Sequence, residues 1–127
     1  SADYRYLVGV HNGLHKGHIP EVLPRNDTLA GPMGRYADQV GGFFFIHRDD
    51  LSNFAPQWLS ITEDVRQDPE AWRLAGDSYV EKGGKPWISE MYGYVFSAAK
   101  NDVWHKWDLT TMHYPTYVPT GVPKVMH

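Results

Sequence analysis

The stretch PWISEMYGY at residues 86–94 combines a helix start with one carboxylate among aromatic and aliphatic side chains. Proline suits the first position of a helix, where its missing N–H costs nothing. Apolar side chains then recur at the spacing of a core-facing helix stripe: Ile88, Met91, Tyr92, Val95 and Ala99. A second row of Trp87, Glu90 and Tyr94 makes this segment apolar on more than one face. The spacing therefore predicts a buried helix over residues 86–99.

Glu90 is the only charged residue between Lys85 and Lys100. An ionised carboxylate is rarely buried without a partner. One interpretation is a structural acid that caps a neighbouring backbone or pairs with an arginine. The other is a site carboxylate that faces a substrate hydroxyl, and we favour this second interpretation.

The composition limits the classes of protein to which the chain can belong. Its 127 residues suffice for one domain, and 42% hydrophobic with 14% aromatic residues indicate a globular fold. A net charge of -3 gives no electrostatic basis for a nucleic-acid partner, and no apolar run is long enough to span a membrane. The absence of cysteine excludes disulfides and thiolate metal sites. The glycosylation sequon Asn26-Asp27-Thr28 is a weak indication of the secretory route.

Hydrophobic patterns and turn residues predict an α/β chain with an incomplete sheet. Helices are expected from Asp49-Asp50, as capping residues, to Asp68-Pro69, and over residues 86–99, with a short helical turn at 34–39. Pro56 marks either the first turn of the earlier helix or a restart. Strands are expected at residues 4–10, 40–47, 103–108, 111–118 and 122–127. Long connections fill residues 11–33 and 70–85.

Two groups of polar residues have alternative interpretations. His11, His15 and His18 have the spacing H-x3-H-x2-H, which chelates a metal when it is helical. The glycines and the proline around them favour a solvated loop instead, and metal binding is the alternative. Glu63 and Asp64 are expected on the polar face of their helix, in solvent.

Several segments resemble one family of enzymes, the plant and algal peptidyl-serine α-galactosyltransferases and the related hydroxyproline O-arabinosyltransferases. Residues 87–94 match the family's WISEMYGY stretch, and the serine galactosyltransferase branch is the nearer one. Further matches are VGG with its following HRDDL, APQWL, EDVRQD, YPTYVP and VMH, at residues 40–51, 55–59, 63–68, 114–119 and 125–127. The histidine-rich segment 11–32 has no recognisable counterpart.

The resemblance implies a partial GT-A-type fold, a Rossmann-like mixed sheet flanked by helices. It implies transfer of a sugar, with retention, from a UDP-sugar to serine or hydroxyproline hydroxyls of extensin-like cell-wall glycoproteins. The expected location is the lumen of the Golgi or endoplasmic reticulum, with any membrane anchor outside this chain. Residues 1–127 are expected to form the C-terminal half of one catalytic domain, inactive when isolated. The alternative is a non-catalytic binding or scaffold module derived from that domain.

The resemblance also assigns roles to individual residues. Glu90 would position sugar or acceptor hydroxyls and stabilise the positive charge that develops at the anomeric carbon. Gly41 and Gly42 would allow the backbone to approach the donor sugar closely. His127 would be one ligand of a divalent metal, with Mn²⁺ expected, in the full-length enzyme. The Asp-x-Asp or Asp-x-His motif that supplies the other ligands in the family does not occur in this chain.

Three aromatic residues of the WISEMYGY stretch complete the expected substrate site. The resemblance implies that Trp87, Tyr92 and Tyr94 stack on sugar faces. For Tyr92, which lies in the core-facing stripe, packing in the core is an equally good interpretation.

Overall fold

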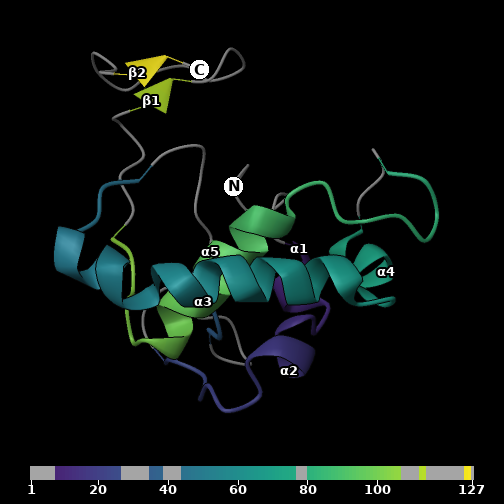
Figure 1. Cartoon of the computed structure of the whole chain (residues 1–127), viewed down its shortest axis with the longest axis horizontal. Helices are drawn as coiled ribbons and strands as arrows, with labels where there is room; N and C mark the ends of the chain where they lie inside the picture. The colour runs from purple at the N-terminus through teal and green to yellow at the C-terminus, as the bar shows by residue number, and fades with distance from the viewer. Residues whose placement is uncertain are drawn as a thin grey trace.

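The computed structural model describes residues 8–26, 35–38, 44–76 and 80–106, together with the backbone of 112–113 and 125–126. The helices are α1 (Val8–His11), α2 (His15–His18), α3 (Arg48–Gln67), α4 (Ala71–Ala75) and α5 (Ser89–Lys100). Two short strands, β1 (Met112–His113) and β2 (Val125–Met126), pair in parallel, apart from the helices (Figure 1). Helix α5 lies against α3, and these two helices form the centre of the fold.

Helix α3 forms where the sequence predicts it, but its first turn is capped differently. The imidazole Nδ1 of His47 accepts a hydrogen bond from the backbone N–H of Asp49, 3.2 Å away. Asp49 and Asp50 lie inside the first turn, where their charges favour the positive end of the helix dipole. The helix continues through Pro56 without a restart. It ends at Gln67, and the following residue, Asp68, caps the helix and precedes a proline.

A glycine lets the two long helices approach closely. A Cβ at Gly93 of α5 would lie 2.9 Å from the carbonyl oxygen of Trp58 and 3.0 Å from the Cα of Thr62, and would also overlap the Thr62 hydroxyl. Buried side chains of α3 on either side of this point face α5: Phe54, Ile61 and Val65. Any side chain larger than hydrogen at position 93 therefore forces the helices apart.

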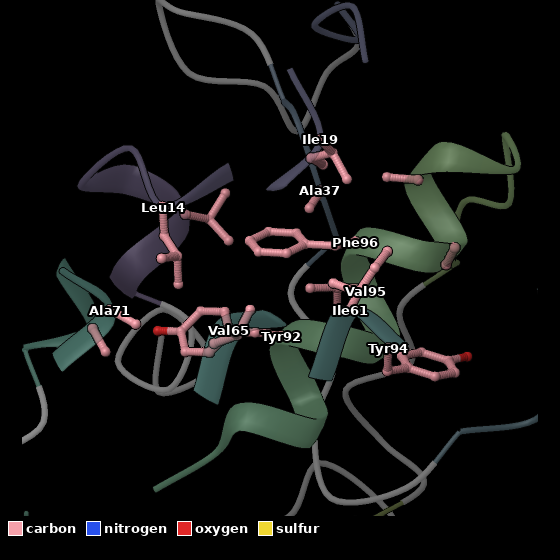
Figure 2. Close-up of a cluster of buried hydrophobic side chains, with 14 of the residues drawn as sticks. Leu14, Ile19, Ala37, Ile61, Val65, Ala71, Tyr92, Tyr94, Val95 and Phe96 are labelled. Carbon is pink, nitrogen blue, oxygen red and sulfur yellow. The ribbon is translucent and has the colours of Figure 1, made fainter. Parts of the chain in front are cut away.

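Helix α5 is buried almost all round, as its apolar spacing predicts. Every residue from 92 to 99 is buried. Phe96 lies among side chains from several elements, including Leu14, Ile19 and Ala37 (Figure 2). The hydroxyl groups of Tyr92 and Tyr94 lie on opposite sides of this cluster (Figure 2). The helix thus contributes to the core on both sides.

The short helices are attached to the long ones by specific polar contacts. The Tyr92 hydroxyl accepts a hydrogen bond from the backbone N–H of Gly9, at 2.9 Å. His18 Nε2 lies 2.9 Å from Asp68 Oδ2, which ties α2 to the end of α3. The Asn12 side chain donates to the carbonyl of Leu74 in α4. These contacts attach the short helices to α3 and α5, either directly or through one another.

The expected fold class is wrong for the described residues. They contain helices and one two-residue strand pair, not the mixed Rossmann-like sheet of a GT-A-type domain. The apolar run at residues 40–47 was expected as a buried strand, but residues 44–47 have no regular structure and Phe45 is 87% exposed. A strand requires pairing with a neighbouring strand, and residues 44–47 have no such pairing in the structure.

Other expected elements also differ. Residues 8–10 are helical instead of extended, and the expected loops contain α2 and α4. Residues 35–38 form a bend with one antiparallel bridge between Arg35 and Arg25 instead of a helical turn. Residues 103–106 are irregular, whereas short parts of the last two expected strands are present as β1 and β2. The remaining residues of these expected elements lie outside the described ranges.

The substitution Gly93→Ala tests the close approach of α3 and α5. Alanine favours a helix by about 1 kcal/mol over glycine. The overlap with backbone atoms of α3 outweighs this gain, so we expect a net loss of about 2 kcal/mol in the free energy of unfolding. Urea denaturation of the variant and the wild type measures this difference in the free energy of unfolding.

The matched control is Gly17→Ala in α2, where an added Cβ would meet no atom within 4 Å. We expect this variant to be at least as stable as the wild type, with a gain of up to about 1 kcal/mol from the helix propensity of alanine. Equal stability of the two alanine variants would contradict the packing described for Gly93.

His15 gives the fold a defined pH dependence. Burial lowers the pKa of its imidazole, assisted by the charges of Lys16 and His11 and opposed by the hydrogen bond to the Val10 carbonyl. Because the folded state disfavours the charged ring, this contribution to stability is complete above the unfolded pKa of about 6.5 and declines as the pH falls below it. We expect His15→Asn to make the urea midpoint depend less on pH between 7.5 and 5.5. An unchanged slope would contradict the prediction.

Candidate functional site at the first turn of helix α5

Glu90 lies in the first turn of α5 and is exposed, not buried. The expectation that its carboxylate is enclosed by aromatic and aliphatic groups is therefore wrong. Its side chain projects from the edge of an otherwise buried helix, because the core-facing stripe runs through Ile88, Met91 and Tyr92 and does not include position 90. A role for this carboxylate at a substrate site stays a prediction.

The backbone of Glu90 is held by α3. The indole Nε1 of Trp58 donates a hydrogen bond to the Glu90 carbonyl oxygen, at 2.8 Å. The hydroxyl of Ser89 donates to the carbonyl of Pro86, at 2.7 Å, which fixes the approach to the helix. The first turn of α5 is thus attached both to α3 and to the preceding residues.

The three aromatic residues predicted to stack on sugars occupy different environments. Trp87 is 72% exposed, whereas Tyr92 and Tyr94 are buried. Tyr92 packs in the core, which is the second interpretation that its spacing allowed. Of the three, only Trp87 has a ring that a ligand can reach in this structure, and sugar stacking by Trp87 stays a prediction.

Tyr94 is the central ring of an aromatic cluster that links three segments. Phe44 stacks on it with ring centroids 4.1 Å apart. Trp58 and Phe54 of α3 meet it edge-on, at 5.0 and 5.6 Å. The same Trp58 side chain that holds the Glu90 carbonyl therefore packs directly on Tyr94.

A chain of polar contacts, here called the Tyr94 network, runs from the Tyr94 hydroxyl through His105 and Asp38 to Arg35. The Tyr94 hydroxyl lies 2.6 Å from His105 Nε2, and His105 Nδ1 lies 2.9 Å from Asp38 Oδ2. The same carboxylate oxygen accepts a hydrogen bond from the backbone N–H of His105. The other oxygen of Asp38 forms an ion pair with Arg35 at 2.8 Å. Only 2% of the Asp38 side chain is exposed.

The chemistry of the groups sets the direction of these hydrogen bonds. A carboxylate can only accept, so His105 donates from Nδ1 to Asp38. In the neutral ring Nε2 is then an acceptor, and the Tyr94 hydroxyl donates to it. Burial, and secondarily the charge of Asp38, raise the pKa of Tyr94 well above its usual range. Tyr94 therefore remains a neutral hydrogen-bond donor, and its role in this network is structural.

Trp104 extends the network on its outer side. The guanidinium groups of Arg25 and Arg35 each lie 5.2 Å from the centroid of the Trp104 ring. The backbones of these two arginines also pair with each other. Sequence reasoning missed the network because Asp38 and His105 are 67 residues apart, and the patterns that predicted elements at 34–39 and 103–108 carry no signal for a pairing between them.

The described residues do not provide a metal centre. No three histidine, aspartate or glutamate side chains among them lie close enough to hold an ion. His15 is buried and stacks on Tyr36, and His18 pairs with Asp68, so the expectation of a solvated histidine loop is wrong for His15. The described residues alone thus do not fit a divalent cation.

Other predicted features can be placed only in part. Gly41, Gly42 and His127 lie outside the described residues, so their predicted roles remain predictions. Glu63 and Asp64 are exposed, as expected. None of the described helices is both long and apolar enough to cross a membrane.

Comparison with known proteins extends over nearly the whole chain. The chain is 61% identical to a peptidyl serine α-galactosyltransferase of Chlamydomonas reinhardtii over 99% of its residues. It is 47% identical to the enzyme of the same name from Arabidopsis thaliana over all of them. A hydroxyproline O-arabinosyltransferase of Medicago truncatula is 33% identical over 59% of the chain. No family model and no solved structure matches.

The galactosyltransferase alignments also include the histidine-rich segment 11–32, for which no motif suggested a counterpart. The chain spans only 17% and 14% of the length of these two relatives. It is homologous along nearly its whole length to a segment of the peptidyl serine α-galactosyltransferases, and more distantly to the hydroxyproline O-arabinosyltransferases.

Proposed function

We propose that this chain is part of a glycosyltransferase that moves a sugar from a UDP-sugar to serine hydroxyls of a peptide. The observation that carries the proposal is the 61% identity, over 99% of the chain, to a peptidyl serine α-galactosyltransferase. The full-length protein is the active species in this proposal.

Serine is the favoured acceptor over hydroxyproline. The two serine galactosyltransferases align with all or nearly all of the chain, whereas the arabinosyltransferases align with little more than half of it at 33% and 29% identity. Galactose is favoured as the transferred sugar for the same reason.

Glu90 is the proposed catalytic carboxylate. It is exposed in the first turn of α5, and its main chain is fixed by Trp58. Transfer with retention breaks the bond from the anomeric carbon to the diphosphate, which leaves as UDP, and forms a new bond to the acceptor oxygen on the same face. The proton of the acceptor hydroxyl passes to the departing diphosphate oxygen. Positive charge develops at the anomeric carbon between bond breaking and bond formation. A fixed carboxylate next to that carbon stabilises the charge more in the transition state than in the ground state.

The proposed location is the lumen of the secretory pathway. The sequon at Asn26 supports it, because Asn26 is exposed and therefore accessible to glycosylation. A divalent metal such as Mn²⁺, with His127 among its ligands, belongs to the same proposal for the full-length enzyme. Its other ligands would come from outside this chain.

The substitution Glu90→Gln in the full-length protein tests the catalytic role. Glutamine keeps the shape of the side chain and removes its charge, so we expect kcat for transfer from UDP-galactose to a serine-rich peptide to fall about 100-fold. The melting temperature should stay unchanged, because the side chain is exposed.

Glu63→Gln is the matched control, since Glu63 is an exposed acid of α3. It should retain the activity of the wild type. Turnover by Glu90→Gln within twofold of the wild type would remove Glu90 from the site. An inactive wild type would instead favour a non-catalytic binding module.

A further inference from the structure

We infer that the Tyr94 network is a positioning device for the first turn of α5, in which Asp38, His105 and Tyr94 fix the orientation of Glu90 through Trp58. The inference deepens the proposed function and rests on it for the role of Glu90. The positioning itself is a property of this chain and can be tested without an assay of enzymatic activity.

The geometry gives a continuous path from the network to the backbone carbonyl of Glu90, the residue that bears the proposed catalytic carboxylate. Asp38 orients the His105 ring by accepting hydrogen bonds from its backbone N–H and from Nδ1. The ring in turn holds the Tyr94 hydroxyl at 2.6 Å. With its hydroxyl fixed, the Tyr94 ring cannot swing, and it provides the face against which Trp58 packs edge-on.

Trp58 completes the path because its ring has two contacts with α5. Its edge meets Tyr94, and its Nε1 donates to the Glu90 carbonyl one turn earlier in the same helix. A displaced Tyr94 ring would tilt the indole and weaken the bond to Glu90. Residues 4 apart in a helix lie on the same face, so both contacts restrain that face of the first turn.

Burial distinguishes this network from an ordinary surface ion pair. Asp38 and His105 side chains are only 2% and 11% exposed, and the Arg35 side chain is 9% exposed. Charged groups in such an environment hold one arrangement, because any other leaves a buried charge without its partner. The network therefore supplies rigidity to a segment whose own functional side chain is exposed.

The first test uses ¹H–¹⁵N NMR on the 127-residue chain with the substitution Asp38→Asn. We expect the indole N–H signal of Trp58 to shift or broaden and the Met91 and Tyr92 amides, which donate to Ile88, to exchange at least about fivefold faster. The indole of Trp72, which donates to the Val80 carbonyl at 3.1 Å, should be unaffected.

Asp68→Asn is the matched control, because Asp68 pairs with His18 at the same 2.9 Å but outside the network. It should leave the Trp58 signal in place. Identical responses of Trp58 and Trp72 to Asp38→Asn, or no response of Trp58, would overturn the inference. Tyr94→Phe removes only the hydroxyl, so it provides the same comparison if Asp38→Asn does not fold.

The second test measures transfer by the full-length protein. A misplaced catalytic carboxylate lowers kcat and kcat/KM together while KM changes little. We expect Tyr94→Phe to reduce kcat about tenfold at unchanged KM, with Asp68→Asn at the activity of the wild type. A loss confined to thermal stability, with kcat intact, would contradict positioning. If Glu90→Gln proves active, the proposed catalytic role of Glu90 fails, but the NMR comparison still decides whether the network orients the first turn of α5.

Discussion

The close approach of α3 and α5 at Gly93 is the constraint on which the rest of the structure depends. Without a side chain at this position, the α5 backbone comes against Trp58 and Thr62 of α3. The short distance between α3 and α5 allows the Trp58 indole to contact both the carbonyl of Glu90 and the ring of Tyr94. A wider spacing would remove the hydrogen bond and the ring contact together. The packing of two helices therefore determines where the exposed carboxylate lies.

The alternation of environments along α5 explains how one helix joins distant parts of the chain. Residues two apart in a helix point in nearly opposite directions. Tyr92 accordingly binds the backbone of Gly9 in α1, while Tyr94 meets His105 and, through it, Asp38. Both hydroxyl groups are used within the fold. This arrangement leaves Glu90 and Trp87, at the start of the helix, as the residues directed to solvent.

The sequence predicted the features that depend on local periodicity. The spacing of apolar residues located α3 and α5 and identified the buried stripe of α5, including Val95 and Ala99. The family resemblance also came from short local motifs, and the alignments, which extend over nearly the whole of this chain, agree with it. These predictions succeeded because neighbouring residues alone determine a helix face.

Predictions that depend on partners distant in the sequence were wrong or absent. The apolar run containing Phe44 and Phe45 reads as a buried strand, yet Phe44 packs on Tyr94 as a single ring. Glu90 seemed buried because its neighbours are apolar, but it lies at the edge of the helix. The pairing of Asp38 with His105 has no local signal, because the two residues are 67 positions apart in the sequence.

The most direct measurement is an experimental structure of the full-length protein with a UDP-sugar and a serine peptide bound. The account predicts that the Glu90 carboxylate lies next to the anomeric carbon while the Trp58 indole still donates to the Glu90 carbonyl. A ligand bound far from Glu90, or a first turn of α5 detached from Trp58, would contradict it.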